Sequence, residues 1–241
     1  MNNKIFNFLT ENLQKAFSLP KYSNITIDKN TIVDNLPWTP AKYDKFKNFI
    51  TETFEIDVNF SNTIEDIVAD IDTKYLNRFF GEIWKPSTEK FSYTGWAIVD
   101  EVNNLNPNKV LDVGCGYNQF KGRIKNLVGI DPFNNNSDYM VDILEYNVDE
   151  KYDVILVFGS INFNSFEDID ARIGKVVSLL TDGGRIYMRA NPGIQHQKGP
   201  WVDVFAWSFD VANQFAKKYN LQLLTFKKDN NDRLYFVYQK Q

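Results

Sequence analysis

The feature that most constrains the fold of this sequence is an apolar run that leads directly into a glycine turn. Residues 109–113 are typical of a buried strand, the turn Gly114-Cys115-Gly116 follows at once, and a second apolar run, 127–131, ends on Asp131. Glycine has no Cβ atom, so such a turn lets the backbone approach a ligand closely. An acid 19 positions after Asp112 is placed to bind both hydroxyls of a ribose. A Gly-x-Gly turn alone also occurs without a ligand, but this order of strand, turn and acid predicts a nucleotide-binding βαβ unit.

Three short motifs indicate which nucleotide is bound. The dinucleotide fingerprint has a third glycine where this chain has Gln119. The run Asp-Val-Gly-Cys-Gly at 112–116 instead resembles the first motif of class I S-adenosylmethionine (SAM) dependent methyltransferases. Gly-Ile-Asp at 129–131 resembles their second motif, and Val-Asp-Ile at 141–143 resembles their third. The resemblance implies SAM as the cofactor and methyl transfer as the reaction.

The same resemblance implies which residues bind the cofactor. In this family the acid of the first motif, here Asp112, lies near the methionine ammonium, and the acid of the second, here Asp131, binds the ribose. Asp142 of the third motif meets the adenine amino group, and Ile143 packs on the adenine ring. Six further residues complete the predicted cofactor site: Gly114, Cys115, Gly116, Asn118, Pro132 and Phe158. Asn118 replaces a third glycine that the family often has, and asparagine tolerates the left-handed conformation better than most residues.

The composition narrows the class of partner. A net charge of −4 over 241 residues predicts no general attraction to nucleic acid. The Asn- or Asp-Pro-Pro-Tyr signature of many nucleic-acid methyltransferases is absent after the predicted strand 152–158. With one histidine and one cysteine, no metal site is expected. The single Cys115 suits a reducing cytosol, and no run approaches the ~20 apolar residues of a membrane span. We therefore expect a soluble cytoplasmic protein.

Residues 97–241 alternate between helix and strand and are predicted to form the SAM-binding domain. Helices are expected at 97–105, after Ser165 and at 209–219, and Asp-Gly-Gly at 182–184 is expected to end the second of them. Seven strands are expected, at 109–113, 127–131, 139–143, 152–158, 185–190, 221–227 and 233–239. The last two are expected to pair antiparallel because a short turn joins them. The predicted fold class is α/β, a Rossmann-like seven-stranded methyltransferase sheet with a small N-terminal helical bundle.

Residues 1–78 are predicted to form that bundle. Amphipathic helices are expected up to Phe17, from Pro40 and from Thr63. Their spacing over residues 4–76 resembles acyl carrier proteins, but Thr-Pro-Ala stands at 39–41 where that family has Asp-Ser-Leu. The serine that carries phosphopantetheine is missing, which favours a degenerate carrier that docks a protein partner or serves as a lid. The alternative is an unrelated helical cap. Residues 79–96 are expected to be a linker or lid, whose aromatic side chains either close over the cofactor or pack between domains.

The methyl acceptor is expected at the carboxyl ends of the strands, where ligands bind in open α/β sheets. His196 is the only imidazole and is a candidate general base. Arg189 is expected either to bind an anionic acceptor or to pair with a neighbouring acid. Trp201 and Trp207 either stack on a planar acceptor or serve in packing. We expect a SAM-dependent methyltransferase whose acceptor is a small molecule or a carrier- or protein-bound group. The alternative is a non-catalytic SAM-binding protein that is recruited through its helical domain.

Overall fold

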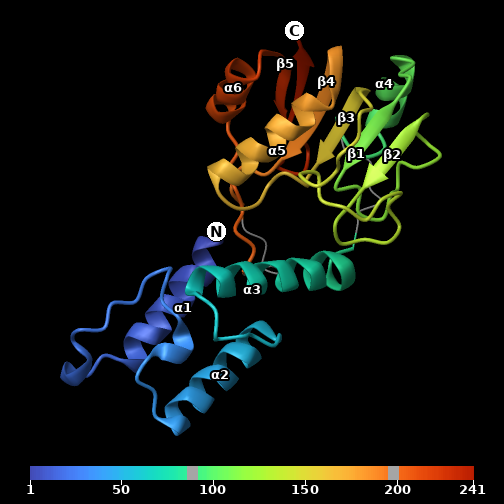
Figure 1. Ribbon diagram of the computed structural model, residues 1–241. Helices are drawn as coiled ribbons and strands as arrows, with labels where there is room; N and C mark the ends of the chain where they lie inside the picture. The colour runs from blue at the N-terminus through green and yellow to red at the C-terminus, as the bar shows by residue number, and fades with distance from the viewer. Residues whose placement is uncertain (86–91, 195–200) are drawn as a thin grey trace. The chain divides into compact units, whose positions relative to one another are not determined.

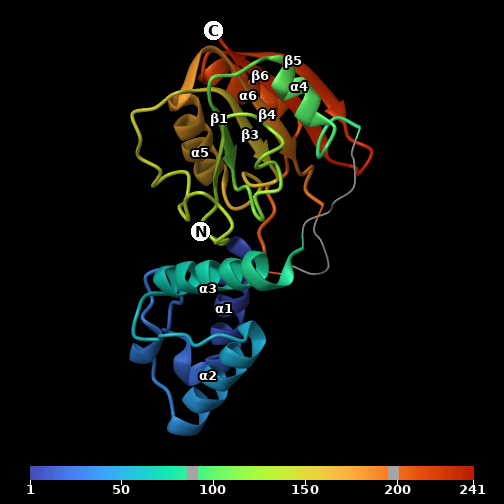
Figure 2. The same ribbon diagram turned by 90° about the vertical axis from the view of Figure 1, so that its right-hand side faces the viewer.

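The computed structural model describes residues 1–85, 92–194 and 201–241. The chain divides into two compact units, whose α-helices and strands are labelled in Figures 1 and 2. The helical unit comprises Met1–Glu82 and His196–Asp203, and the sheet unit comprises Ile83–Gln195 and Val204–Gln241. Each unit has hydrophobic core residues of its own.

Among the described residues, the helical unit contains three α-helices: α1 (Asn3–Ala16), α2 (Pro40–Phe54) and α3 (Ile64–Arg78). The Asn2 side chain accepts hydrogen bonds from the N–H groups of Lys4 (3.1 Å) and Ile5 (3.2 Å), which caps α1. Helix α2 begins with a proline, and Thr63 caps α3. Short helical turns lie at Pro20–Tyr22, Val33–Asn35 and Phe79–Ile83. Apolar side chains three or four positions apart give each α-helix a face toward one core: Ile5, Leu9, Leu13, Phe46, Ile50, Phe54, Ile64, Ile67, Val68 and Ile71.

Within its described residues, the sheet unit contains one six-stranded mixed sheet in the order β2-β1-β3-β4-β6-β5. The strands are β1 (Val110–Val113), β2 (Leu127–Ile130), β3 (Tyr152–Phe158), β4 (Leu180–Ala190), β5 (Leu221–Lys228) and β6 (Leu234–Lys240). Strands β1 to β4 run parallel, and β6 pairs antiparallel with both β4 and β5. The prediction of an antiparallel final pair is confirmed.

Different helices cover the two faces of this sheet. The helices are α4 (Ile98–Asn104), α5 (Phe166–Ser178) and α6 (Phe209–Lys218). Leu111 and Ile155 pack with α5 and α6 in one core, whereas their sequence neighbours Val110 and Val154 pack with α4 in another. Successive side chains of a strand point to opposite faces, so the apolar strands are buried on both sides. Figure 2 shows α4 and α5 on opposite sides of the strands.

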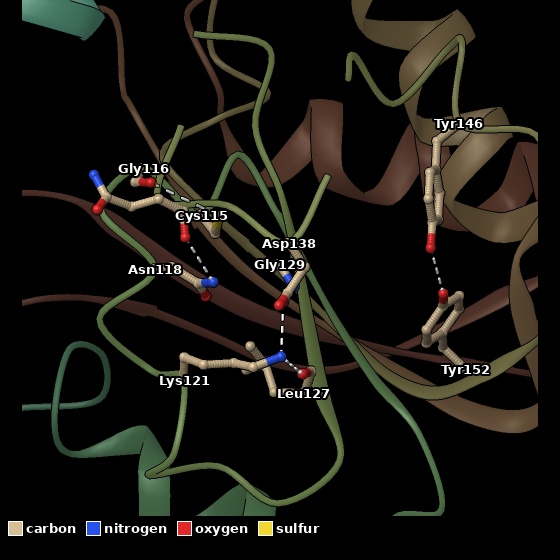
Figure 3. Close-up of polar contacts among 10 residues, drawn as sticks. Cys115, Gly116, Asn118, Lys121, Leu127, Gly129, Asp138, Tyr146 and Tyr152 are labelled. Atoms are coloured by element: carbon tan, nitrogen blue, oxygen red, sulfur yellow. Dashed lines mark hydrogen bonds and ion pairs between the residues drawn. The ribbon is translucent and has the colours of Figure 1, made fainter. Parts of the chain in front are cut away.

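The predicted strand at 139–143 does not form, so the described sheet has six strands instead of seven. This segment makes only an isolated bridge to β2. Side chains bind the edge of β2 instead. The Asp138 carboxylate accepts the N–H of Gly129 at 2.8 Å, and the Lys121 ammonium donates to the Leu127 carbonyl at 2.8 Å. Lys121 and Asp138 also pair with each other at 2.8 Å (Figure 3). A further strand would need backbone groups that this ion pair already occupies.

Strand β4 begins earlier than the sequence predicted. Helix α5 ends at Ser178, and β4 starts at Leu180 and continues through the Asp-Gly-Gly run at 182–184. Its register with β3 is irregular over this stretch, and Gly183 has a φ of +74°. The glycines therefore accommodate a bulge within a strand, where the sequence had suggested only the end of a helix.

Candidate active site

The glycine turn after β1 lies against the segment that leaves β3. Gly114 has a φ of +68°, and a Cβ atom at this position would lie 2.2 Å from the Cβ atom of Ser160. The Ser160 hydroxyl donates to the Val113 carbonyl at 2.5 Å, and the Gly114 N–H donates to the Ile130 carbonyl at 2.8 Å. Only glycine fits both the conformation and the space. The turn is thus fixed at the carboxyl ends of β1, β2 and β3.

Trp84 covers the turn at Gly116. Gly116 has a φ of +55°, and a Cβ atom there would lie 3.0 Å from Cζ3 of the Trp84 ring. The Trp84 and Tyr117 ring centroids are 6.1 Å apart, and the Lys85 ammonium donates to the Tyr117 hydroxyl at 3.2 Å. Both Trp84 and Lys85 come from the segment predicted to be a linker or lid, and they belong to the sheet unit. The sequence indicates this segment but not which of its rings reaches the turn.

The carboxylate of Asp131 is oriented by backbone N–H groups. It accepts the N–H of Gly116 at 2.9 Å and the N–H of Phe133 at 2.8 Å. Asp131 is 7% exposed, and burial raises its pKa although these N–H donors oppose the rise. The first and second motifs are therefore joined directly, because the turn of one binds the acid of the other. Pro132, which follows this acid, is partly buried.

Asp112 is the second buried acid of the site. It lies on β1 and is 3% exposed. Burial and the negative charge of Asp131 raise the pKa of Asp112 to about 7. A positively charged ligand beside the two carboxyl groups would favour their ionised forms.

Asn118 and Cys115 fill the space between the turn and β2. Asn118 has a φ of +53°, and its side chain donates to the Asn136 carbonyl at 3.1 Å. A Cβ atom on Gly129 would lie 2.6 Å from Asn118 Oδ1 and 2.9 Å from Cys115 Sγ, so the glycine of the second motif makes room for the first. Burial and the charges of three neighbouring aspartates raise the pKa of the Cys115 thiol. The thiol therefore stays protonated and serves in packing.

The acid of the third motif is held by an arginine that no sequence motif predicts. Arg172 of α5 donates to both carboxylate oxygens of Asp142, at 2.7 and 2.6 Å, and the Leu144 N–H donates to the same carboxylate at 2.9 Å. Arg172 lies 30 positions from its partner, and no sequence motif links the two. Ile143 is 2% exposed and packs in the core on the α5 side of the sheet.

Phe158 ends β3 on the face that α4 covers. It packs against Phe120 with ring centroids 5.9 Å apart, and Phe120 in turn packs against Trp96 at 5.7 Å. The three rings form one aromatic row next to the strand end that was predicted to contact the cofactor.

Arg189, the predicted contact for an anionic acceptor, pairs with a neighbouring acid. Its Nε donates at 3.1 Å to the Asp229 carboxylate, whose side chain is fully buried, and the Thr94 hydroxyl donates to the same oxygen at 2.5 Å. Burial lowers the pKa of Arg189, and the contact with Asp229 opposes that change. This geometry supports the second of the two predicted roles. His196, the predicted general base, lies outside the described residues.

Two asparagines join the loops at the carboxyl ends of β3 and β4. Asn162 Oδ1 accepts the N–H of Asn191 at 2.8 Å, and the backbone carbonyls of these two residues accept the N–H groups of Phe205 (2.8 Å) and Trp207 (2.9 Å). Trp207 is 2% exposed and donates from Nε1 to the Ile161 carbonyl at 2.9 Å, so it is a core residue of the sheet unit. The packing role of Trp207 is thereby favoured over stacking on an acceptor.

The described residues contain no group of three His, Cys, Asp or Glu side chains that is arranged to hold a metal ion. No helix in the described ranges is both long and apolar enough to cross a membrane.

Comparisons with known proteins bear on the fold. No protein-family model and no curated protein matches the sequence. The structure is similar to that of the N-methyltransferase NodS from Bradyrhizobium japonicum WM9 in complex with S-adenosylhomocysteine. That match has 15% identity and a TM-score of 0.52, and it covers 69% of this chain and 97% of that one. Magnesium protoporphyrin IX methyltransferase (ChlM) from Synechocystis PCC 6803, also with bound S-adenosylhomocysteine, matches at 12% identity with a TM-score of 0.52, covering 70% of this chain and 100% of that one. The chain therefore has the α/β Rossmann-like fold of class I SAM-dependent methyltransferases, with a mixed sheet of six strands among its described residues.

Proposed function

We propose that this protein is a SAM-dependent methyltransferase. The observation that carries the proposal is the pair of buried acids, Asp112 and Asp131, at a glycine turn on the carboxyl ends of the strands. Ligands of open α/β sheets bind at this edge. Both solved structures named above are methyltransferases with bound S-adenosylhomocysteine, which supports SAM as the cofactor of this chain.

The residues at the turn fit SAM. Glycines at positions 114 and 116 allow the turn to adopt positive φ values and to pack closely under Ser160 and Trp84, which keeps it compact at the carboxyl ends of the strands. SAM carries positive charge on its sulfonium and its ammonium, and two buried carboxyl groups favour a cationic ligand. We assign Asp112 to the ammonium end and Asp131 to the ribose hydroxyls. Trp84, which lies on the turn at Gly116, shields this part of the site from water.

The adenine contact through Asp142 remains compatible with its arginine partner. A carboxylate has about four lone-pair sites for hydrogen bonds, so Asp142 keeps acceptor capacity after binding Arg172. Arg172 then fixes the carboxylate in one orientation. Phe158 is partly buried at the end of β3 and contributes apolar surface, whereas Ile143 is 2% exposed and packs in the core.

Methyl transfer depends mainly on the alignment of the acceptor atom with the methyl group of SAM. When bound, SAM supplies a methyl group on a sulfonium for in-line displacement. The chain contributes proximity and orientation, worth up to ~7–11 kcal/mol in favourable cases, and a base only where the acceptor is protonated at neutral pH. We assign the base to His196, and we assign to Arg189 a role in ordering the acceptor side through Asp229. The proposed acceptor is a small molecule or a carrier- or protein-bound group, with the helical unit as the site for a protein partner.

Calorimetry of the full chain with S-adenosylhomocysteine tests the cofactor assignment. We expect binding of S-adenosylhomocysteine and none of NAD. Asp131→Ala should weaken binding because the ribose loses a charged acceptor, and each such bond is worth about 1.5–3 kcal/mol. Asp170→Ala is the control, because it removes a carboxylate of the same unit that pairs with Lys218 at 2.6 Å. Absence of binding by the wild-type chain would overturn the proposal, and unchanged affinity in Asp131→Ala would overturn the role of that residue.

Turnover separates an enzyme from a non-catalytic SAM-binding protein. Incubation with SAM and a pool of small metabolites should produce S-adenosylhomocysteine, detected by mass spectrometry. His196→Ala should lower this turnover and leave the affinity for S-adenosylhomocysteine unchanged. A protein that binds S-adenosylhomocysteine but does not produce it from SAM with any acceptor pool is a non-catalytic binding protein.

A further inference from the structure

Trp201 belongs to the core of the helical unit, although the chain on both sides of residues 196–203 belongs to the sheet unit. Its ring centroid lies 4.8 Å from that of Phe8 on α1 and 4.7 Å from that of Phe54 on α2. These distances are typical of aromatic pairs that add stability beyond the area they bury. The ring is thus one component of the packing between two helices at the start of the chain.

Hydrogen bonds hold the same short segment in place. The Asn2 side chain, whose residue is 1% exposed, donates from Nδ2 to the Trp201 carbonyl at 2.7 Å and also to Asp72 at 2.7 Å. The Lys4 ammonium donates to the Val202 carbonyl at 3.0 Å. Asn2 caps α1 with its Oδ1 atom at the same time. A single buried amide therefore joins the start of α1, α3 and the segment 201–203, which we call the anchor segment.

The chain leaves the anchor segment and enters the acceptor edge of the sheet unit within one residue. Val204 forms a bridge with Phe163, in the loop after β3. The next residue donates its N–H to the Asn162 carbonyl, and Trp207 donates its N–H to the Asn191 carbonyl. Residues 204–207 thus connect the loops that follow β3 and β4, at the edge where the proposed function places the acceptor. We call residues 204–207 the return segment.

We propose that Trp201 is a positioning residue for the acceptor side of the site, and that the helical unit acts on methyl transfer by holding the anchor segment. This proposal rests on the proposed function for the identity of that site. A segment whose adjoining residues are ordered has fewer conformations to lose when a substrate is bound. Proximity and orientation are the main sources of rate in this chemistry. The two ring pairs of Trp201 lie within the helical unit, whereas every predicted cofactor residue belongs to the sheet unit. We therefore expect its effect at the acceptor loops, which the return segment joins, and none on cofactor binding.

Hydrogen exchange of the full-length protein, followed by mass spectrometry, tests this role without a known acceptor. Trp201→Ala should speed exchange of the Phe205 and Trp207 amides by about tenfold or more, because local opening sets their protection. Trp201→Phe keeps a ring against Phe8 and Phe54 and should restore most of the protection. S-adenosylhomocysteine affinity, measured by calorimetry on the same samples, should be equal in all variants.

The matched control is Phe46→Leu. Phe46 lies in the same helical core, 5.2 Å from Trp38 and 5.7 Å from Phe60 between ring centroids, but it does not touch the anchor segment through either pair. It should loosen the helical unit without speeding exchange in the return segment. If Trp201→Ala prevents folding, Lys4→Met removes one hydrogen bond to the anchor segment and should speed exchange there to a smaller extent. Unchanged exchange in the Trp201 and Lys4 variants, or an equal increase in Phe46→Leu, would overturn the proposal. Loss of S-adenosylhomocysteine binding by the wild type would instead count against the proposed function.

Discussion

The ionised form of Asp112 favours the binding of a cationic ligand, whereas the neutral form favours folding. Its pKa rises from 3.8 to about 7, first because of burial and second because of the charge of Asp131. An acid whose pKa is higher in the folded than in the unfolded state contributes stability that is full below its unfolded pKa. That stability is lost as the pH rises through the folded pKa. Because of this one residue, the free energy of unfolding falls as the pH rises from about 4 to about 7.

We predict that Asp112→Asn is more stable than the wild type at about pH 8, because the amide has no charge to bury. The advantage should shrink as the pH falls below about 7 and vanish near pH 4. Urea unfolding at a series of pH values measures it. The same variant should bind S-adenosylhomocysteine more weakly, since a neutral amide does not balance the ammonium. A stability difference independent of pH would contradict the raised pKa.

The side chains that could be predicted from the sequence are those whose partners are encoded nearby. The glycines of the turn, Asp112 and Asp131 belong to short motifs, and their order along the chain indicates a nucleotide site. Arg172, Ser160 and Trp84 could not be predicted in this way. Each reaches the site from 30 or more positions away, as Arg172 does toward Asp142. Such contacts depend on how strands and helices pack, and they have no local periodicity.

Among the strands, β2 is an edge that side chains protect. Burial favours the neutral form of Asp138, but hydrogen bonds from the Gly129 N–H and from Lys121 lower the pKa of its carboxyl below the ordinary value. A lowered pKa means that this contribution to stability is present above the unfolded pKa and is lost as the pH falls through the folded one. The ion pair also leaves fewer free backbone groups on the edge for another chain to bind.

We predict that Asp138→Ala lowers the free energy of unfolding by about 1 kcal/mol or more, because the Gly129 N–H loses its acceptor. It should also increase light scattering at high protein concentration, because an open strand edge pairs with other chains. Glu150→Ala removes a carboxylate that also pairs with a lysine, Lys109 at 2.7 Å, but its side chain is 53% exposed, so the change should cost less than ~1 kcal/mol. If the two variants lose the same stability and scatter light equally, the Lys121–Asp138 pair does not protect the edge of β2.

Strands could be predicted where apolar runs are bounded by turn residues, as in β1, β2, β3 and the final hairpin. The prediction of a strand at 139–143 was wrong because this segment is apolar in sequence but has no open sheet edge to pair with. Lys121, which occupies that edge, lies 17 positions before Asp138. The early start of β4 was missed because a glycine pair indicates a helix end and a strand bulge equally well.

For the chain as a whole, the division into units departs from a simple split between the first third and the rest. Sequence pattern assigned everything after residue 97 to one domain, whereas residues 201–203 pack in the helical unit. No composition shift marks them, and their partners Phe8 and Phe54 lie more than 140 positions earlier. The acyl carrier resemblance of the helical unit stays a prediction.

We predict that cofactor binding is a property of the sheet unit alone. Asp112, Asp131 and Trp84 all belong to it. A fragment of residues 83–241 should therefore bind S-adenosylhomocysteine as tightly as the full-length protein. The fragment carries Trp201→Ser, because the tryptophan ring would be exposed to water when the helical unit is absent. Circular dichroism verifies the fold, and calorimetry measures the affinity. A folded fragment that does not bind would show that the helical unit supplies part of the cofactor site.

The place of Trp201 in the helical core also sets an order of events on the ribosome. Domains commonly fold in the order in which they are synthesised. Here residues 1–82 are made before the sheet unit, but the ring that packs on Phe8 and Phe54 is added about 120 residues after Glu82. At about 5–20 residues per second this delay is roughly 6–24 s. During that time Phe8 and Phe54 can pack on each other but lack the Trp201 ring, so the helical unit is completed only after most of the sheet unit has been synthesised.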